Sequence, residues 1–424
     1  MKILSVHNAY QHRGGEDVAR EAETRLLQQA GHEVVEYMRS NIGLSDASIL
    51  RRVSLATETV WSSRTSRELG AFLLREKPDV AHFHNTVPLI SPSAYYACAE
   101  AGVPVVQTLH NYRLLCPGAN LLRDGRVCEE CLGKSLAWPG ILHGCYRDSH
   151  LATAAVAAML AGHRAMGTWL EKIDVYVALT EFARRKFIEG GLPGDRISVK
   201  TNFVECDPGP KQCPGGYALY VGRLSEEKGL RVLLAAWARI RGDIQLKVAG
   251  DGPLREEIAS IILRQRLGTV ELLGHLSPQE IRSLMQGAYS LVFPSICFEN
   301  FPLAIAEAFA CGLPVIAPNQ GAMAEIVADG ATGLHFIPAD PEELAGKVEW
   351  AWMHPQEMAA MGRAARAEFE SKYTAAAALK QLENLYKSVL QNRRPPRSRP
   401  DLWYQQKSSL APTAGKEPTE CKPS

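Results

Sequence analysis

The chain has 424 residues, of which 47 are lysine or arginine and 46 are aspartate or glutamate, so its formal net charge is +1 at pH 7. This length suits two domains of about 150 to 200 residues each. The balanced charge excludes an overall field that would attract nucleic acid or an anionic membrane, so we expect no nucleic-acid partner and only local basic patches toward a membrane.

The N-terminus predicts a first β-strand and not a secretory signal. Its apolar character ends at His7, which leaves too short a stretch for export. The longest nearly uncharged run, residues 151–162, is shorter than the ~20 residues that a membrane-spanning helix needs. We therefore expect a cytoplasmic protein whose ten cysteines are in a reducing compartment.

The first half of the chain alternates β-rich apolar runs with helical patterns, which is typical of a parallel, doubly wound sheet. The stretch 205–216 then collects proline and glycine and predicts a linker between domains. The predicted strands of this half cover residues 2–8, 34–39, 80–84, 103–109, 175–180 and 197–204.

The second half begins the same alternation again, and two such sheets in series leave a cleft lined by the carboxyl ends of their strands. We predict an α/β fold of two Rossmann-like domains, residues 1–205 and 206–371. A helix at 372–391 is expected to pack back on the first domain, and the proline-rich stretch 392–424 to form a disordered tail. The predicted strands of this half cover residues 217–221, 245–249, 270–273, 291–293 and 314–317.

The first chemical motif is the turn at residues 222–229, directly after a predicted strand and before a helical pattern. Its backbone N–H groups lie at a helix start, and Arg223 and Lys228 add two cations that can neutralise a diphosphate. The alternative is a basic helix start on a solvated surface.

The second motif is Glu-x7-Glu, with Glu299 before a predicted helix and Glu307 inside it. Pro302 suits the first turn of that helix, where its missing N–H has no helical partner. A carboxylate such as Glu307 in an apolar segment is costly to bury unless it is paired or bound to ligand, and vicinal sugar hydroxyls are suitable donors. Alternatively, Glu299 complements the helix dipole and Glu307 pairs with a neighbouring cation.

Together these motifs are more specific than either is alone. The turn at 222–229, a Gly-Asp-Gly-Pro turn at 250–253, and Glu-x7-Glu followed by Cys-Gly-Leu-Pro-Val-Ile at 311–316 resemble the family-four retaining glycosyltransferases of the GT-B fold. The resemblance is strongest over residues 217–338. In the first half, Gly-Gly-Glu at 14–16 and Gly-His-Glu-Val at 31–34 look like the acceptor-side domain of that family.

The resemblance implies a donor site on the second domain. Arg223 and Lys228 would hold the diphosphate, Glu307 would bind the ribose hydroxyls, and Glu299 would contact the transferred sugar. The nucleotide base would rest against the turn at 274–276. The residues whose backbone N–H groups would lie near the sugar or the phosphates are Asn300, Phe301 and Leu303.

The first domain would complete this site. Gly14 and Gly15 match a glycine loop that closes over the donor phosphates, where a side chain would block close approach. His110 matches a histidine that faces the sugar, although it could also be a packed or helix-capping histidine. The commoner sequence of this motif is Glu-Gly-Phe-Gly, and this chain has Asn300 and Pro302 in place of the two glycines. Because of this difference, the identity of the transferred sugar is not inferred.

Family resemblance also implies the mechanism and the partners. Front-face displacement, in which the leaving diphosphate assists deprotonation of the acceptor hydroxyl, needs no metal or other cofactor. We expect a UDP- or GDP-sugar donor and a glycan or glycolipid acceptor in cell-surface glycan synthesis. Basic pairs or triplets at 51–52, 184–186 and 393–394 favour peripheral contact with the inner face of the membrane, or are ordinary solvated faces.

Two other functions fit the same fold. One is a GT-B nucleotide-sugar epimerase, against which the Glu-x7-Glu context argues. The other is a catalytically silent sugar-nucleotide-binding protein, against which the intact Arg223, Lys228, Glu299 and Glu307 argue.

Four cysteines form a separate motif inside a glycine-rich insertion at residues 116–147. The spacing Cys-x11-Cys-x2-Cys-x13-Cys suits a structural zinc site, because thiolates satisfy tetrahedral zinc. An iron–sulfur cluster would use the same thiolates, His143 could replace one of them, and the alternative is four free or packed thiols. The predicted ligands are Cys116, Cys128, Cys131 and Cys145.

Overall fold

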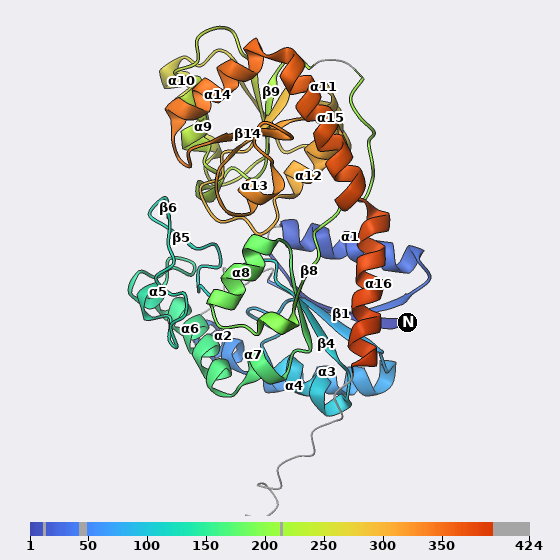
Figure 1. Ribbon diagram of the computed structural model, residues 1–424. Coiled ribbons are helices and arrows are strands. Elements are labelled where there is room, and N and C mark those ends of the chain that lie inside the picture. Colours follow the sequence, from blue (N-terminus) through green and yellow to red (C-terminus); the bar gives the residue numbers. More distant parts are fainter. Residues whose placement is uncertain (12–13, 42–48, 213–214, 393–424) are drawn as a thin grey trace, which may run out of the picture.

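The computed structural model describes residues 1–11, 14–41, 49–212 and 215–392. They form two α/β domains, one above the other in Figure 1, each with a six-stranded parallel sheet and helices packed against it. The predicted architecture of two doubly wound sheets is confirmed.

The sheet of the N-terminal domain has the strand order β2-β1-β3-β4-β7-β8, and all neighbouring strands are parallel. Helices cover both faces, so nearly every residue of the central strands β1, β3 and β4 is buried, polar residues included. The strands are β1 (Lys2–Ala9), β2 (Glu33–Ser40), β3 (Val80–Asn85), β4 (Val105–Thr108), β7 (Val175–Ala178) and β8 (Ile197–Val199).

Local sequence explains where several of its helices begin. Ser62, Ser149 and Thr180 precede α3, α6 and α8, and each side-chain oxygen accepts a hydrogen bond from the backbone N–H three residues later. The helices are α1 (Gly15–Gln29), α2 (Ile49–Val60), α3 (Ser63–Glu76), α4 (Ser93–Ala101), α6 (His150–Ala165), α7 (Thr168–Glu171) and α8 (Glu181–Glu189), with the 3-10 turn η1 (Gly194–Arg196).

The sheet of the C-terminal domain has the order β11-β10-β9-β12-β13-β14. Its edge strand β14 was not predicted from the sequence. The strands are β9 (Ala218–Val221), β10 (Leu246–Ala249), β11 (Val270–Gly274), β12 (Ser290–Val292), β13 (Val315–Pro318) and β14 (Gly333–Phe336). The helices are η2 (Glu226–Lys228), α9 (Leu230–Trp237), α10 (Arg255–Gln265), α11 (Pro278–Gly287), α12 (Leu303–Ala310), α13 (Gly321–Ile326), α14 (Pro341–Met353) and α15 (Pro355–Lys372).

The strand order of this sheet identifies where a ligand should bind. The sheet grows in one direction from β9 to β10 and β11 and in the other from β12 to β14, so its topological switch point lies between β9 and β12. Ligands of open α/β sheets bind outside the carboxyl ends of the strands at this point. The segments that leave β9 and β12 there contain the two predicted donor motifs.

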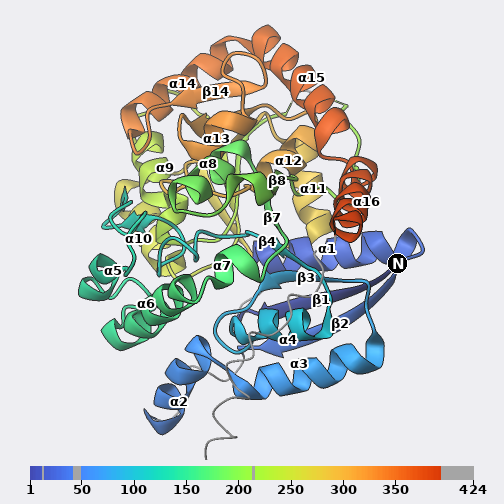
Figure 2. The ribbon, with the colours of Figure 1, turned by 60° about the horizontal axis from the view of Figure 1, so that its bottom comes forward.

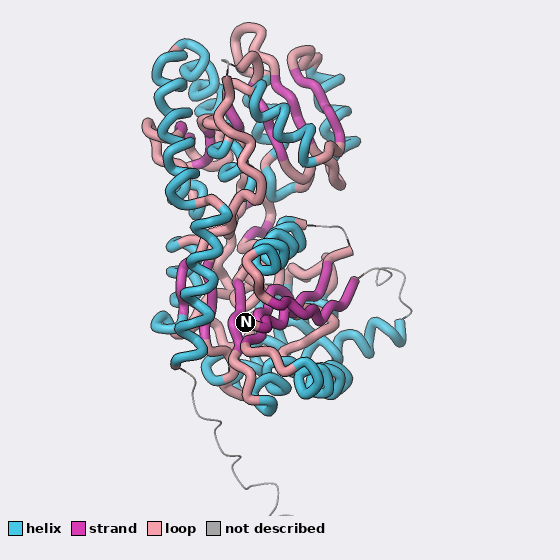
Figure 3. The backbone as a smooth tube through the Cα atoms, turned by 90° about the vertical axis from the view of Figure 1, so that its right-hand side faces the viewer, coloured by secondary structure: helices cyan, strands magenta, loops and turns pink. Residues whose placement is uncertain are grey.

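The chain crosses between the domains twice, side by side. Val204, on the outward segment, forms a parallel bridge with Thr374, on the returning one. The last helix, α16 (Ala375–Gln391), then packs on the N-terminal domain, where Leu382 and Tyr386 are fully buried in a cluster with Ile3. Figure 3 shows α15 and α16 running from one domain onto the other.

The segment 116–147 extends from the loop after β4. It contains a hairpin of two short strands, β5 (Leu122–Arg123) and β6 (Arg126–Val127), and the helix α5 (Trp138–Leu142), which packs on α6 (Figure 2). Its own core consists of Cys131 and Ala137 with Ala157 of α6. A core this small contributes little stability.

Candidate active site

Two glycines allow the turns at the switch point to pack as one unit. Gly229 has a φ of +71°, and a Cβ atom there would lie 1.9 Å from the carbonyl oxygen of Pro294. A Cβ atom at Gly250 would lie 1.9 Å from the carbonyl oxygen of Gly222. The turns after β9, β10 and β12 are therefore in backbone contact at these points, which only glycine permits.

Lys228 and Glu299 form an ion pair within this unit, with 2.7 Å between Nζ and Oε1. The Ser295 hydroxyl donates to the same carboxylate oxygen at 2.7 Å. Burial acts to lower the pKa of Lys228, but the Glu299 carboxylate outweighs it, so the pKa of Lys228 is raised and the ammonium stays charged. The structure thus brings together two residues that were assigned to the diphosphate and to the sugar.

Arg223 lies on the same turn as Lys228 and is exposed. Its guanidinium makes no hydrogen bond or ion pair with any residue of the described chain. An exposed guanidinium without a protein partner is available to bind an anion such as a diphosphate.

The loop before α12 presents unpaired polar groups. The Asn300 side chain is buried, and its Oδ1 has no partner among the residues that the structure describes. Within the same described ranges, the backbone N–H groups of Asn300, Phe301 and Leu303 donate no hydrogen bond. Orphan groups at a helix start are suitable for binding a ligand.

Glu307 lines a cavity of about 190 Å³ between the two domains, together with Arg282, Leu303 and residues of α1. Burial raises its pKa to about 7, and the positive charge of Arg282 offsets only part of this effect. The carboxylate accepts no hydrogen bond from the described part of the chain. The Glu307 carboxylate is therefore free to accept hydrogen bonds from two vicinal hydroxyls of a ligand.

Gly14 and Gly15 lie at the start of α1. Gly14 is the N-cap, with extended backbone, and its N–H donates to Asp17 Oδ2 at 2.8 Å. A Cβ atom on Gly15 would meet nothing within 4 Å, so no contact with the described residues requires glycine there. The predicted reason, close approach of donor phosphates, stays a prediction.

His110 lies two residues after the end of β4 and is partly buried. Its Nε2 lies 3.0 Å from Nδ1 of His84. Burial lowers the pKa of His110 to about 3, so the ring is neutral near pH 7. It can exchange hydrogen bonds with a sugar but offers no charge to a diphosphate.

The N-terminal domain contacts the donor loop directly. The Tyr112 hydroxyl donates to the backbone carbonyl of Glu299 at 3.4 Å, and the Thr180 hydroxyl donates to that of Asn300 at 3.3 Å. Phe182 also packs on Phe298 with ring centroids 4.8 Å apart. The loop that carries Glu299 is thus supported from both domains.

A buried polar cluster at the carboxyl edge of the N-terminal sheet was missed by the sequence analysis. Its members come from separate segments, so no local motif identifies them. Two histidines two residues apart in a predicted strand were the available signal, because such residues share one face. The cluster contains His7, Asp17, Glu23, His82, His84 and Lys200.

The four cysteines of the insertion lie close to one another as free thiols. A Cβ atom on Gly118 would lie 3.6 Å from Cys116 Sγ and 3.1 Å from the carbonyl oxygen of Cys145. Burial raises the pKa of Cys131 to about 11, and the other three thiols act in the same direction. Their sulfurs do not form a preformed tetrahedral set, since the one group of three ligand atoms within 4.8 Å in the described ranges is that of Glu23, His82 and His84.

Comparison with known proteins agrees with this geometry. Residues 14–208 match the family model described as Glycosyltransferase Family 4, and residues 211–368 match the model described as Glycosyl transferases group 1. An alpha-D-kanosaminyltransferase of Streptomyces kanamyceticus is 32% identical over 299 residues, which cover 68% of this chain and 71% of that relative.

Other curated relatives match over a shorter stretch. A D-rhamnosyltransferase of Pseudomonas aeruginosa is 32% identical over 162 residues, 38% of this chain and 42% of its own length. An uncharacterized glycosyltransferase of Methanocaldococcus jannaschii is 36% identical over 132 residues, 31% of this chain and 37% of its own length. The chain thus spans less than half the length of these two relatives.

Solved structures with the same fold cover nearly the whole chain. HepE of Anabaena in complex with UDP-glucose has a TM-score of 0.63 at 19% identity and covers 92% of this chain and 100% of that one. Sucrose-phosphate synthase from Thermosynechococcus elongatus has a TM-score of 0.68 at 18% identity and covers 92% and 98%.

These likenesses define the class as two-domain proteins of the GT-B fold, and the predicted fold class is confirmed. The chain belongs to the glycosyl transferases group 1 family. The family resemblance stated from the sequence motifs is confirmed as well.

Proposed function

We propose that this protein is a retaining glycosyltransferase that moves a sugar from a nucleotide diphosphate sugar to an acceptor hydroxyl. The observation that carries the proposal is the Lys228–Glu299 pair beside the unpaired Arg223, at the switch point of the C-terminal sheet. Two cations can neutralise a diphosphate there, and the carboxylate can accept hydrogen bonds from sugar hydroxyls. Membership of the family supports the same activity.

In the proposed reaction, Arg223 and Lys228 stabilise the negative charge that grows on the leaving diphosphate. Glu299 keeps its bond from Ser295 and takes sugar hydroxyls as further donors. An oxygen of the leaving diphosphate accepts the proton of the acceptor hydroxyl on the same face of the sugar, so the configuration is retained. Because the two side chains supply the positive charge, we propose no metal or other cofactor for the transfer.

The proposed donor is a UDP- or GDP-sugar. Solved structures of HepE contain UDP and UDP-glucose, which favours UDP. The Glu307 carboxylate, partly buried and without a hydrogen-bond donor in the described chain, is the proposed ligand of the ribose hydroxyls.

Thermal unfolding in the presence of UDP-, GDP- and ADP-sugars tests the donor, because at equal concentration a donor that binds more tightly raises Tm more. We expect one nucleotide class to raise Tm, and NMR of the anomeric proton of the product to show retention. No shift with any donor would contradict the proposal. A donor sugar that changes configuration without transfer would identify an epimerase, and binding without turnover a silent binding protein.

We further propose that the acceptor is a glycan or glycolipid and that the N-terminal domain meets it at the inner face of the cell membrane. None of the helices in the described part of the chain is long and apolar enough to cross a bilayer, so this contact would be peripheral. The exposed Lys134 and Arg147 could meet anionic lipid headgroups. Large apolar side chains are exposed along α5, α6 and α7 and the segments beside them, which lie together in Figures 1 and 2: Leu136, Trp138, Leu142, Leu151, Met166 and Leu170.

The basic patches that the sequence indicated support membrane contact less than these exposed residues do. Arg184 donates to backbone carbonyls, and Lys186 pairs with Glu129 and Glu189. The pair at 393–394 lies outside the described residues. Cosedimentation with anionic vesicles tests the contact: Trp138→Ala with Leu142→Ala should weaken it, and equal binding by the variant would count against it.

The insertion is proposed to bind one structural zinc ion through Cys116, Cys128, Cys131 and Cys145. Support comes from the proximity of these free thiols and from the small core of the insertion. Such a site would brace the loop and supply no chemistry to the transfer.

A further inference from the structure

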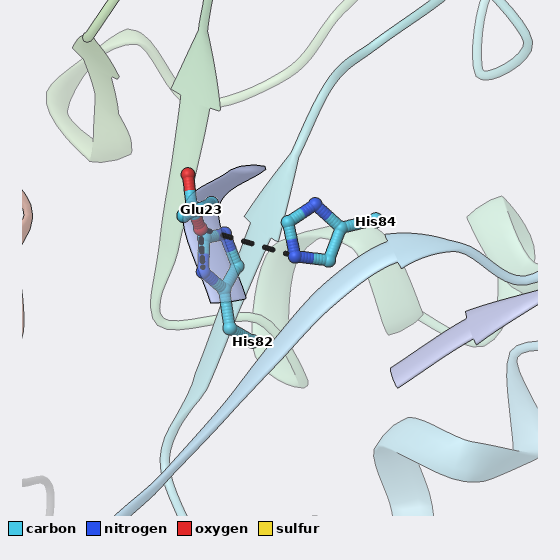
Figure 4. A group of neighbouring side chains, drawn as sticks. All are labelled: Glu23, His82 and His84. Atoms are coloured by element: carbon cyan, nitrogen blue, oxygen red, sulfur yellow. Dashed lines mark ion pairs between the residues drawn. The ribbon is translucent and has the colours of Figure 1, made fainter. Parts of the chain in front are cut away.

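A buried polar network leads from α16 to His110 through the middle of the N-terminal domain. Glu23 of α1 faces both His82 and His84 of β3, as the dashed lines in Figure 4 show, and all three side chains are at most 7% exposed. His82 Nδ1 is 2.9 Å from Glu23 Oε1 and 2.8 Å from the Tyr386 hydroxyl of α16. This network lies outside the donor-binding motifs of the C-terminal domain.

Glu23, His82 and His84 have the spacing of a metal site, but the Glu23 carboxylate is already paired with the cation of a lysine. Lys200, itself 4% exposed, places its ammonium 2.7 Å from Glu23 Oε2. His82 is bonded at both ring nitrogens, because its Nε2 also lies 2.7 Å from the Thr108 hydroxyl. The Lys200 ammonium thus supplies the positive charge that a buried carboxylate requires.

His84 connects this carboxylate to His110. Its Nε2 is 3.9 Å from Glu23 Oε1, and its Nδ1 is 3.0 Å from His110 Nε2. Burial lowers the pKa of both histidines, so both rings are neutral near pH 7. Two neutral imidazoles share one proton in such a contact, so one ring donates and the other accepts.

The Glu23 carboxylate decides which ring donates. It favours a proton on the His84 Nε2 that faces it, because the other tautomer would point a lone pair at a charged oxygen. His84 Nδ1 is then bare and accepts the proton of His110 Nε2–H. His110 Nδ1 is bare in turn, and it makes no hydrogen bond within the described ranges.

We propose that Glu23 and His84 are positioning residues that hold His110 as a neutral ring with a bare, hydrogen-bond-accepting Nδ1. The identity of the ligand rests on the proposed function: His110 would accept a hydrogen bond from a hydroxyl of the donor sugar. A carboxylate in place of that sugar hydroxyl has no proton to donate, so its oxygen would face the lone pair of His110 Nδ1. A bare Nδ1 on His110 would therefore favour neutral, hydroxylated donor sugars over uronic acids.

The tautomer of His110 can be measured without any substrate. Long-range ¹H–¹⁵N NMR of ¹⁵N-histidine-labelled protein distinguishes a bare from a protonated ring nitrogen, and loss of the signals in His110→Gln assigns them. We expect a bare Nδ1 and a protonated Nε2. A protonated Nδ1 on His110 in the wild-type protein would overturn the proposal.

Two variants of His84 separate positioning from packing. His84→Asn keeps an amide oxygen near the position of Nδ1 and should preserve the His110 tautomer, whereas His84→Leu removes the acceptor and should yield a mixture. An unchanged tautomer in folded His84→Leu would overturn the role of His84. With a donor from the thermal screen, kcat/KM should fall in His84→Leu and recover in His84→Asn.

A metal on the cluster is the remaining outcome that would overturn the proposal, because it would replace the proton on His84 Nε2. Elemental analysis of a Cys128→Ser, Cys131→Ser variant removes the contribution of the insertion. If this variant still contains one equivalent of metal and loses it when Glu23→Gln is added, the metal is bound by the Glu23, His82 and His84 cluster. Failure of the glycosyltransferase assay leaves the NMR result intact, so the two proposals fail separately.

Discussion

At the scale of single residues, Lys228 faces two anions in turn. In the structure its ammonium pairs with the Glu299 carboxylate, and in the proposed reaction it also meets the donor diphosphate. The pair keeps both charges satisfied in a partly buried place, where an isolated charge would be costly. Ligand binding then rearranges an existing ion pair and does not have to bury a new charge.

Lys228→Ala should lower kcat/KM for transfer at least about tenfold while the fold survives, because a cation on the leaving diphosphate is lost. Arg231→Ala is the matched control, since this exposed cation pairs at 2.7 Å with Glu257 on the surface. Steady-state kinetics and Tm of both variants check the prediction. Wild-type turnover in Lys228→Ala would remove Lys228 from the site.

Glu307 should make donor affinity depend on pH. Its pKa of about 7 means that the carboxyl is largely protonated below that pH, whereas ribose hydroxyls donate to the ionised form. Donor affinity should therefore rise as the pH increases through about 7 and level off above it. Calorimetric titration with the donor sugar measures this, and Glu307→Gln should bind more weakly with a flat profile. A profile in the variant that parallels the wild type would assign the titration to another group.

At the scale of elements, the donor site depends on how closely three turns approach one another. Gly229 is essential to that approach because its Cβ position is occupied by the backbone of Pro294. The same contact places the loop after β12, which contains Glu299, beside Lys228. Stability and activity are therefore coupled at this glycine.

Gly229→Ala should be much more destabilising than Gly330→Ala. Both glycines have a φ of +71°, but a Cβ atom at Gly330 meets nothing within 4 Å. Gly330→Ala should cost only the backbone strain, about 1 kcal/mol, and Gly229→Ala about 1 to 3 kcal/mol more from the clash. Urea unfolding of both variants measures the difference, and equal losses would argue against backbone contact between these turns.

The cysteine insertion is the element whose stability should depend on an ion. Purified protein should contain about one equivalent of zinc, lost in the Cys128→Ser, Cys131→Ser variant, because thiolates are the ligands. Cys206→Ser, an exposed thiol elsewhere, is the control. Elemental analysis and Tm check this; a metal-free, fully active and equally stable preparation would exclude the zinc site.

At the scale of the whole molecule, the last helix makes the N-terminal domain dependent on the end of the chain. Tyr386 of α16 is fully buried and bonds to His82, which belongs to β3 more than 300 residues earlier. The N-terminal core is thus completed only after the C-terminal domain has been synthesised. The two domains are joined by this helix as well as by the linker.

Two truncations should therefore differ sharply. Removal of residues 393–424 should leave Tm unchanged, because that stretch is poor in core-forming residues. Removal from residue 375 onward should lower Tm strongly, because the N-terminal core loses the buried side chains of Leu382 and Tyr386. A thermal scan of both proteins measures this, and similar stability of the two would contradict the packing role of α16.

The sequence by itself determined the fold class and the donor motifs. Most of the parallel strands are recognised from short apolar runs, and the signals that begin and end a helix lie within a few residues of one another. The alternation of strands and helices can therefore be predicted from short stretches of the sequence. Arg223 and Lys228 lie in one turn, and Glu299 and Glu307 in one loop and helix, so each motif is also local. The edge strand β14 and the hairpin in the insertion were not predicted.

Only the tertiary structure decided which of these groups meet. The pairing of Lys228 with Glu299 joins residues 71 positions apart, and the contact of His82 with Tyr386 joins residues 304 positions apart. Such pairs leave no local pattern, because a buried charge or imidazole is satisfied by whichever partner the packing of distant elements brings within bonding distance. The network of Glu23, His84 and His110 therefore became visible only when α1, β3 and the end of β4 were placed side by side.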